Sequence, residues 1–192
     1  KSSLEKMAKT FPDSSQPYLQ MASIDLMENN IEAAEQHLNQ ALKVDPKNSK
    51  LKAAIADFYA KKGKIEQAEQ LYKEAIQGAE KPEDLEAQLA NFYFDYGKYD
   101  QAKAEMDKVL AKNEKNAMAK LVQAKFQLKD GKNQEALDSV TALIRDYPKW
   151  GELFFVKSTI ADYHHFIQFR AVFYHAEIDE CIGRACLFFL RF

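Results

Sequence analysis

The residues with the most reactive side chains lie near the C-terminal end of the chain. They are His164, His165, His175, Cys181 and Cys186. Zinc binds imidazole nitrogen and thiolate sulfur, so these atoms could serve as metal ligands. The spacing matches no familiar zinc site, however, and the two cysteines are too far around a helix to share one face. We therefore expect ordinary residues here, with no metal site and no cofactor.

Other signatures of catalysis are missing from the sequence. It has no Gly-rich phosphate loop, no G-x-S-x-G turn and no H-E-x-x-H pair. Nothing places a histidine beside a cysteine as its base. Carboxylates such as Glu66, Glu69 and Glu74 are expected to form a solvated helix face. We therefore expect that the chain is not an enzyme.

Composition narrows the classes of partner. The 192 residues carry a net charge of -2, which gives no positive surface for nucleic acid. No run of about 18 apolar residues is present, so no membrane span is expected. The only two cysteines follow residue 180, which excludes a disulfide framework. The 46% hydrophobic content is sufficient for a core.

A ten-residue sequence motif recurs at a fixed interval. GKIEQAEQLY begins at Gly63, GKYDQAKAEM at Gly97 and GKNQEALDSV at Gly131, so successive copies are 34 residues apart (97 − 63 = 131 − 97 = 34). Four repeats keep this phase without a gap: 15–48, 49–82, 83–116 and 117–150. A residue's place is counted below from the start of its repeat.

Recurring small residues predict two helices in each repeat. Alanine occupies the eighth and twentieth places: Ala22, Ala34, Ala56, Ala68, Ala90, Ala102, Ala124 and Ala136. An invariant alanine fits two helices that cross too closely for a larger side chain. The fifteenth place holds Asn29, Gly63, Gly97 and Gly131. These residue types end a helix because they adopt a left-handed conformation readily. Each repeat is therefore predicted to be a helix, a turn and a second helix.

The pattern resembles the tetratricopeptide repeat (TPR) family. The matching residues are Tyr18, Met21, Ala22, Asn29, Ala34, Leu38, Ala41 and Pro46, then Ile55, Ala56, Tyr59, Gly63, Ala68, Tyr72 and Ala75, then Leu89, Ala90, Tyr93, Gly97, Ala102 and Met106, and finally Ala124, Gly131, Ala136, Val140 and Pro148. The resemblance implies an all-α fold, a right-handed superhelical solenoid of antiparallel helix pairs. Asp25 and Gln127 depart from the family, since an aromatic residue is usual at the eleventh place. We expect them to loosen local packing.

The ends of the chain are expected to complete the array. Residues 1–14 fit the second helix of a truncated preceding repeat, so we expect the native protein to continue upstream. Residues 151–165 fit the first helix of a partial fifth repeat, and 166–192 form a non-repeat helical tail or cap. Three interpretations of this tail remain open. It caps the solenoid, it forms a surface for self-association or partner binding, or it is foreign sequence.

The resemblance implies a concave groove lined by the first helices. Places two, five, nine, twelve and thirteen supply the candidate groove residues: Leu19, Ser23, Leu26, Met27, Lys50, Asp57, Lys61, Asn91, Phe94, Asp95, Met118, Leu121, Lys125 and Leu128. An alternative for the leucines is that they pack between neighbouring repeats. Relatives that bind acidic chaperone tails use lysine and asparagine at places that here hold Leu19 and Ser23, so that partner is not expected.

These observations predict a non-catalytic scaffold that binds a peptide or helix of a partner protein in its groove. The alternative is a regulatory or targeting segment of a larger enzyme or of an export or secretion assembly. The repeat sequences also resemble those of repeat proteins of the bacterial cell envelope, which leaves a periplasmic location open.

Overall fold

A computed structural model describes residues 2–161, and all regular structure in that range is helical. In chain order the helices are α1 (Ser2–Thr10), α2 (Gln16–Met27), α3 (Ile31–Val44), α4 (Ser49–Lys61), α5 (Ile65–Gln77), α6 (Glu83–Asp95), α7 (Tyr99–Lys112), α8 (Ala117–Lys129) and α9 (Asn133–Asp146). Residues 151–161 are helical as well. The all-α fold predicted from the sequence is confirmed.

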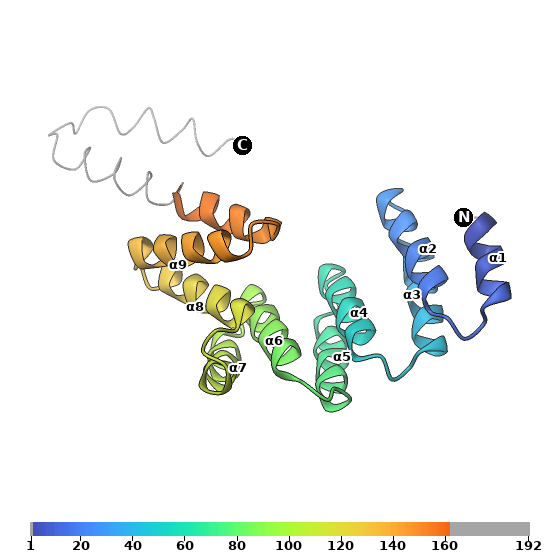
Figure 1. Ribbon diagram of the computed structural model, residues 1–192, viewed down its shortest axis with the longest axis horizontal. Coiled ribbons are helices and arrows are strands. Elements are labelled where there is room, and N and C mark those ends of the chain that lie inside the picture. The colour runs from blue at the N-terminus through green and yellow to red at the C-terminus, as the bar shows by residue number, and fades with distance from the viewer. Residues whose placement is uncertain (1, 162–192) are drawn as a thin grey trace, which may run out of the picture. The chain divides into compact units, whose positions relative to one another are not determined.

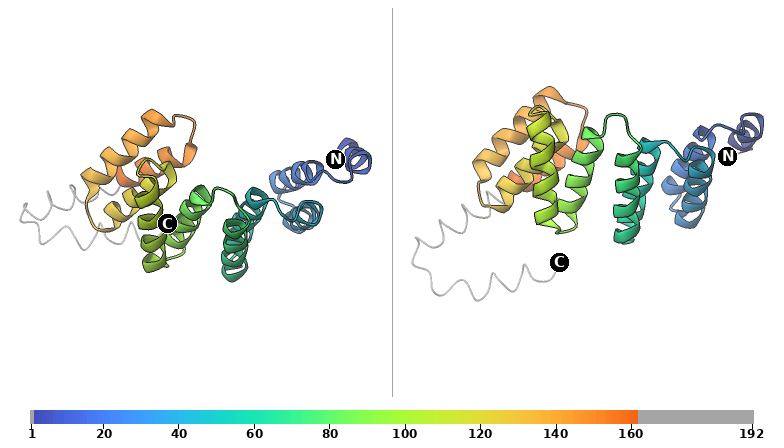
Figure 2. Two further views of the ribbon diagram at one scale, coloured as in Figure 1. Left: turned by 60° about the horizontal axis from the view of Figure 1, so that its bottom comes forward. Right: turned by 90° about the horizontal axis from the view of Figure 1, so that it is seen from below.

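The chain divides into two compact units, Lys1–Ala119 and Lys120–Phe192. In the first unit, α2 packs with α3, α4 with α5, and α6 with α7 (Figure 1). These helix pairs follow one another along the unit, since α3 also contacts α4 and α5 contacts α6 (Figure 2). In the second unit, α8 lies beside α9, and Ser139 of α9 donates a hydrogen bond of 3.0 Å to Gln127 of α8.

The turn inside each helix pair is built as the sequence predicts. Asn29 has φ 60°, and Gly63, Gly97 and Gly131 have φ between 74° and 78°. The next backbone N–H then reaches back to the first helix. Lys64, for example, donates to the Tyr59 carbonyl at 2.9 Å. This left-handed residue closes the end of the helix and reverses the chain.

The recurring alanines lie where the two helices of a pair meet. Those of the eighth and twentieth places are at most 1% exposed. Around Ala22 and Ala34, the apolar residues Leu38, Leu51 and Ile55 form a continuous core from α2 through α3 to α4. A repeated alanine therefore fixes a close helix crossing, and the larger residues fill the space between neighbouring pairs.

The polar residues at the eleventh place have partners on the second helix of their own repeat. Asp25 is only 1% exposed, and its carboxylate lies 2.6 Å from Nδ1 of His37 on α3. Gln127 accepts its hydrogen bond from Ser139 in the corresponding position of the fourth repeat. The polar residues that replace the usual aromatic thus have hydrogen-bonding partners at the twenty-third place, so their polar groups are satisfied, and looser packing around them stays a prediction.

Ion pairs join the two helices of a repeat at a second set of places. Lys52 of α4 lies 3.3 Å from Glu74 of α5. In the next repeat the charges are exchanged, and Glu86 of α6 lies 2.8 Å from Lys108 of α7. In these two repeats, the charge at the fourth place therefore has its opposite at the twenty-sixth, in either order.

Several expectations fall outside the described residues. These are the histidine and cysteine set from His164 to Cys186, the end of the helix predicted for 151–165, and the tail of 166–192. Within residues 2–161, no helix has the length and apolar character needed to cross a membrane.

Candidate partner-binding face

The candidate residues of the first unit come mainly from α2, α4 and α6. They occupy equivalent places in these helices, and α4 contacts α6 directly. Ser23, Leu26, Met27, Lys50, Asp57, Lys61 and Asp95 are exposed, whereas Leu19, Asn91, Phe94 and Met118 are half-buried. This set is called the first-helix face below.

The α2 part of the first-helix face is apolar. The side chain of Met27 is 85% exposed and that of Leu26 is 43% exposed, at the C-terminal end of the helix. Leu19, two turns earlier, instead packs against the core around Ala22 and Ile55. Exposed methionine adapts its shape to an apolar partner surface, so this end can bind apolar side chains without a preformed pocket.

The α4 part carries charge of both signs. Lys50 and Lys61 are exposed near the two ends of the helix, and Asp57 lies between them. Asp57 accepts a hydrogen bond from the buried hydroxyl of Tyr72 on α5. Burial raises the pKa of Tyr72, and the negative charge of Asp57 raises it further. The hydroxyl therefore stays protonated and holds the carboxylate in place.

The α6 part combines aromatic and polar side chains. The Phe94 ring meets Tyr99 edge to face, with centroids 5.3 Å apart. Asn91 donates a hydrogen bond of 3.1 Å to the Asp95 carboxylate. Each side chain is thus oriented by a neighbour one turn or one helix away, which lowers the entropy lost when a partner binds.

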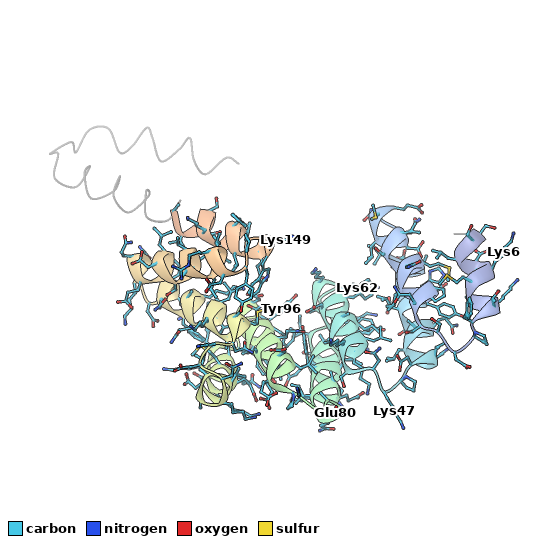
Figure 3. The ribbon with its side chains drawn as sticks, viewed as in Figure 1. Lys6, Lys47, Lys62, Glu80, Tyr96 and Lys149 are labelled. Atoms are coloured by element: carbon cyan, nitrogen blue, oxygen red, sulfur yellow. The ribbon has the colours of Figure 1, made fainter. Side chains whose placement is uncertain are left out.

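Tyr96 was missed by the sequence analysis. It follows the end of α6 and is labelled in Figure 3. Its side chain is 38% exposed, and its ring centroid lies 5.0 Å from that of Phe92. Burial raises the pKa of Tyr96, and the charges of Asp95 and Asp57 add to the effect. The carboxylates of α4 and α6 therefore lie near the same hydroxyl. In the sequence, only the position of Tyr96 directly before the glycine of the turn could have indicated that it belongs to this surface.

The second unit contains three candidate groove residues, and one of them, Leu121, does not lie on the surface as expected. Leu121 has no exposed surface, so it belongs to the core and cannot contact a partner in this structure. The fifth place is a packing position in the earlier repeats as well, where Ala53 and Ala87 are buried. Lys125 pairs with Glu152 at 3.1 Å, and Leu128 is half-buried.

The first-helix face can make noncovalent contacts with a partner. Among the residues that the structure describes, no cluster of histidine, cysteine, aspartate or glutamate could hold a metal ion. The shifted pKa values of Tyr72 and Tyr96 accompany hydrogen bonds and packing and make both hydroxyls weaker acids. Exposed apolar side chains beside oriented charges suit recognition of another chain.

Comparison with known families gives one match. The tetratricopeptide repeat family matches residues 1–58 and 59–126, which together exceed half of the chain. No curated protein sequence matches.

Solved structures share the fold at low sequence identity. TTC0263 of Thermus thermophilus, a thermophilic TPR protein, is 20% identical with a TM-score of 0.62, covering 82% of this chain and 87% of that chain. The type IV pilus biogenesis factor PilW is 16% identical with a TM-score of 0.62, covering 92% and 86%. YrrB, described as a TPR protein with an unusual peptide-binding site, is 18% identical with a TM-score of 0.52, covering 84% of each chain. At these identities the likeness shows the fold alone.

Proposed function

Because the chain belongs to the tetratricopeptide repeat family, we propose that it is a non-catalytic scaffold that binds a peptide or helix of a partner protein along its first-helix face. The observation that carries the proposal is the exposure of Met27, at 85%, on a helix whose opposite side is built into the core. Together with the adjacent exposed Leu26 it forms an apolar surface, the kind of feature that marks contact sites.

The neighbouring residues support the same function. Leu26 extends the apolar surface, and Phe94 of α6 and Tyr96 just after that helix provide aromatic surface. The charges of Lys50, Lys61 and Asp57 lie between these apolar ends in the order of the helices. An amphipathic segment with apolar anchors and a polar centre matches this pattern. YrrB, which shares the fold, is itself described as having a peptide-binding site.

The test uses a random library of 12-residue peptides selected on the full chain. Binding of the enriched peptides is then measured to a Met27→Ala/Phe94→Ala variant and to Tyr147→Ala. Tyr147 is 45% exposed but follows α9, so it provides a matched exposed side chain away from the first-helix face. We expect the double variant to lose binding while keeping its far-UV ellipticity, and Tyr147→Ala to bind normally. Equal loss in both variants, or in neither, contradicts the proposal.

A second candidate function is targeting within a larger enzyme, export or secretion assembly. The fold likeness to PilW, a pilus biogenesis factor, favours this alternative and a place in the bacterial cell envelope. Sedimentation of the protein from its native cells separates the two candidates. A small free species supports the scaffold, whereas co-sedimentation with a large assembly supports the targeting segment.

A further inference from the structure

Two neighbouring repeats are joined by a cluster of charge and aromatic surface. Glu35 of α3 accepts hydrogen bonds from Lys62, labelled in Figure 3, and from Lys64 at 2.7 Å. Lys64 Nζ lies 5.0 Å from the ring centroid of Tyr59 on α4. The Tyr59 hydroxyl in turn donates to Asn39 of α3 at 3.2 Å. The second helix of one repeat is thereby attached to the first helix and the turn of the next.

The same three residue types meet again one repeat later, although here the tyrosine hydroxyl bonds to the glutamate itself. Glu69 of α5 accepts from Lys98 and, at 3.1 Å, from the Tyr93 hydroxyl. Lys98 Nζ lies 5.8 Å from the Tyr93 ring centroid. Burial raises the pKa of Glu69, but Lys73, Lys98 and Tyr93 together lower it to about 2. Glu69, expected from the sequence to be a solvated carboxylate, is therefore an ionised anchor between repeats.

The turn geometry explains why the lysine reaches the tyrosine. The backbone N–H of Lys98 bonds to the Tyr93 carbonyl across Gly97, at 2.8 Å, which returns the lysine to the helix end that carries the ring. The cluster needs glutamate at the twenty-first place, followed by tyrosine at the eleventh and lysine at the sixteenth place of the next repeat. We call it the Glu–Tyr–Lys clamp.

The third set of equivalent places cannot make this clamp. In sequence register it holds Lys103, Gln127 and Lys132, two cations and an amide. Gln127 bonds to Ser139 inside the fourth repeat, and Lys132 lies 3.8 Å from Glu135 in that repeat. The boundary between the two compact units falls at Ala119 and Lys120, in the same stretch of chain.

From these two observations we infer that the array is divided into a clamped block, residues 15–116, and a second block, residues 120–161, that unfolds separately. The division is a property of the repeats and is independent of the proposed function. A partner that contacts both blocks would have to fix two bodies, whereas a partner confined to α2, α4 and α6 meets one preorganised body.

The chain carries its own reporter for the second block. Trp150 is its only tryptophan and lies in the second compact unit, while seven of the named helices, α1 to α7, lie in the first. Tryptophan fluorescence and far-UV ellipticity are followed for the full chain in urea. We expect the fluorescence midpoint at lower urea than the ellipticity midpoint. Coincident midpoints would overturn the inference.

Two variants test whether the missing clamp is the cause. Lys103→Glu/Gln127→Tyr, beside the native Lys132, restores the three residue types of the first two clamps and should move the fluorescence midpoint towards the ellipticity midpoint. Gln101→Glu/Gln127→Tyr introduces the glutamate at another exposed position of α7 and should leave the separation unchanged. Ellipticity without urea verifies that each variant is folded. Equal shifts in both variants, or no shift in Lys103→Glu/Gln127→Tyr, would refute the clamp as the cause.

Discussion

Gly97 offers a clean test of the turn that builds every repeat. Its φ of 74° is left-handed, and a Cβ added there would have no other heavy atom within 4 Å, so the cost of a side chain is conformational. For an alanine that conformation costs about 1–2 kcal/mol, and the stiffer unfolded chain offsets about 0.4–1 kcal/mol. We therefore expect Gly97→Ala to lower the free energy of unfolding by about 1 kcal/mol.

The chain supplies the control for this prediction. Asn29 occupies the same place in the first repeat with φ 60°, so Gly97→Asn should cost less than Gly97→Ala. Gly97→Val should cost more than about 1 kcal/mol, because a β-branched residue resists positive φ. Urea unfolding followed by far-UV ellipticity gives the three values. If alanine is tolerated as well as glycine, or asparagine is as harmful as valine, the reasoning about the turn is refuted.

Three further predictions concern packing and charge. Ala90→Leu should lower the free energy of unfolding by about 1–3 kcal/mol in urea, because Ala90 has no exposed surface, whereas Ala104→Leu on the exposed side of α7 should not. Exchanging Lys52 and Glu74, as the next repeat does, should recover part of the stability that each single reversal loses, with a coupling of about 0.2–1 kcal/mol in a double-mutant cycle; additive losses would contradict this. Since the folded pKa of Glu69 is about 2, below its ordinary 4.5, its ionised form stabilises the fold above pH 4.5 and that stability is lost as the pH falls towards 2. Glu69→Gln should flatten stability measured across this pH range, and an unchanged slope would exclude the effect.

The fold was predictable because its determinants are local and repeated. An alanine at a helix crossing and a glycine at a left-handed turn each have one physical reason, and four copies in phase removed the ambiguity of a single motif. The positive φ of Gly63, Gly97 and Gly131 and the burial of Ala90 follow from residue type at a recurring place in the repeat. Whether the repeat boundaries themselves fall at 15–48 and its successors stays a prediction.

The candidate site was less predictable because exposure depends on the neighbouring helices. Met27 is exposed as expected, yet Leu121 at a place assigned to the same face is buried, since the fifth place packs in this array. Tyr96 was overlooked because it lies beyond the end of its helix. The pairing of Asp25 with His37 joins two helices and could not be recognised from either residue separately.

A partner segment bound along the first-helix face would lie against Met27. The methyl groups of the five methionines report this directly by NMR, on the full chain with one of the selected peptides added. Met27 and Met7 form the informative pair, since both are exposed, at 85% and 37%, but Met7 lies on α1, outside the face. We expect the Met27 methyl signal to shift with peptide concentration while that of Met7 does not. A bound peptide that shifts Met7 and leaves Met27 unchanged would contradict it.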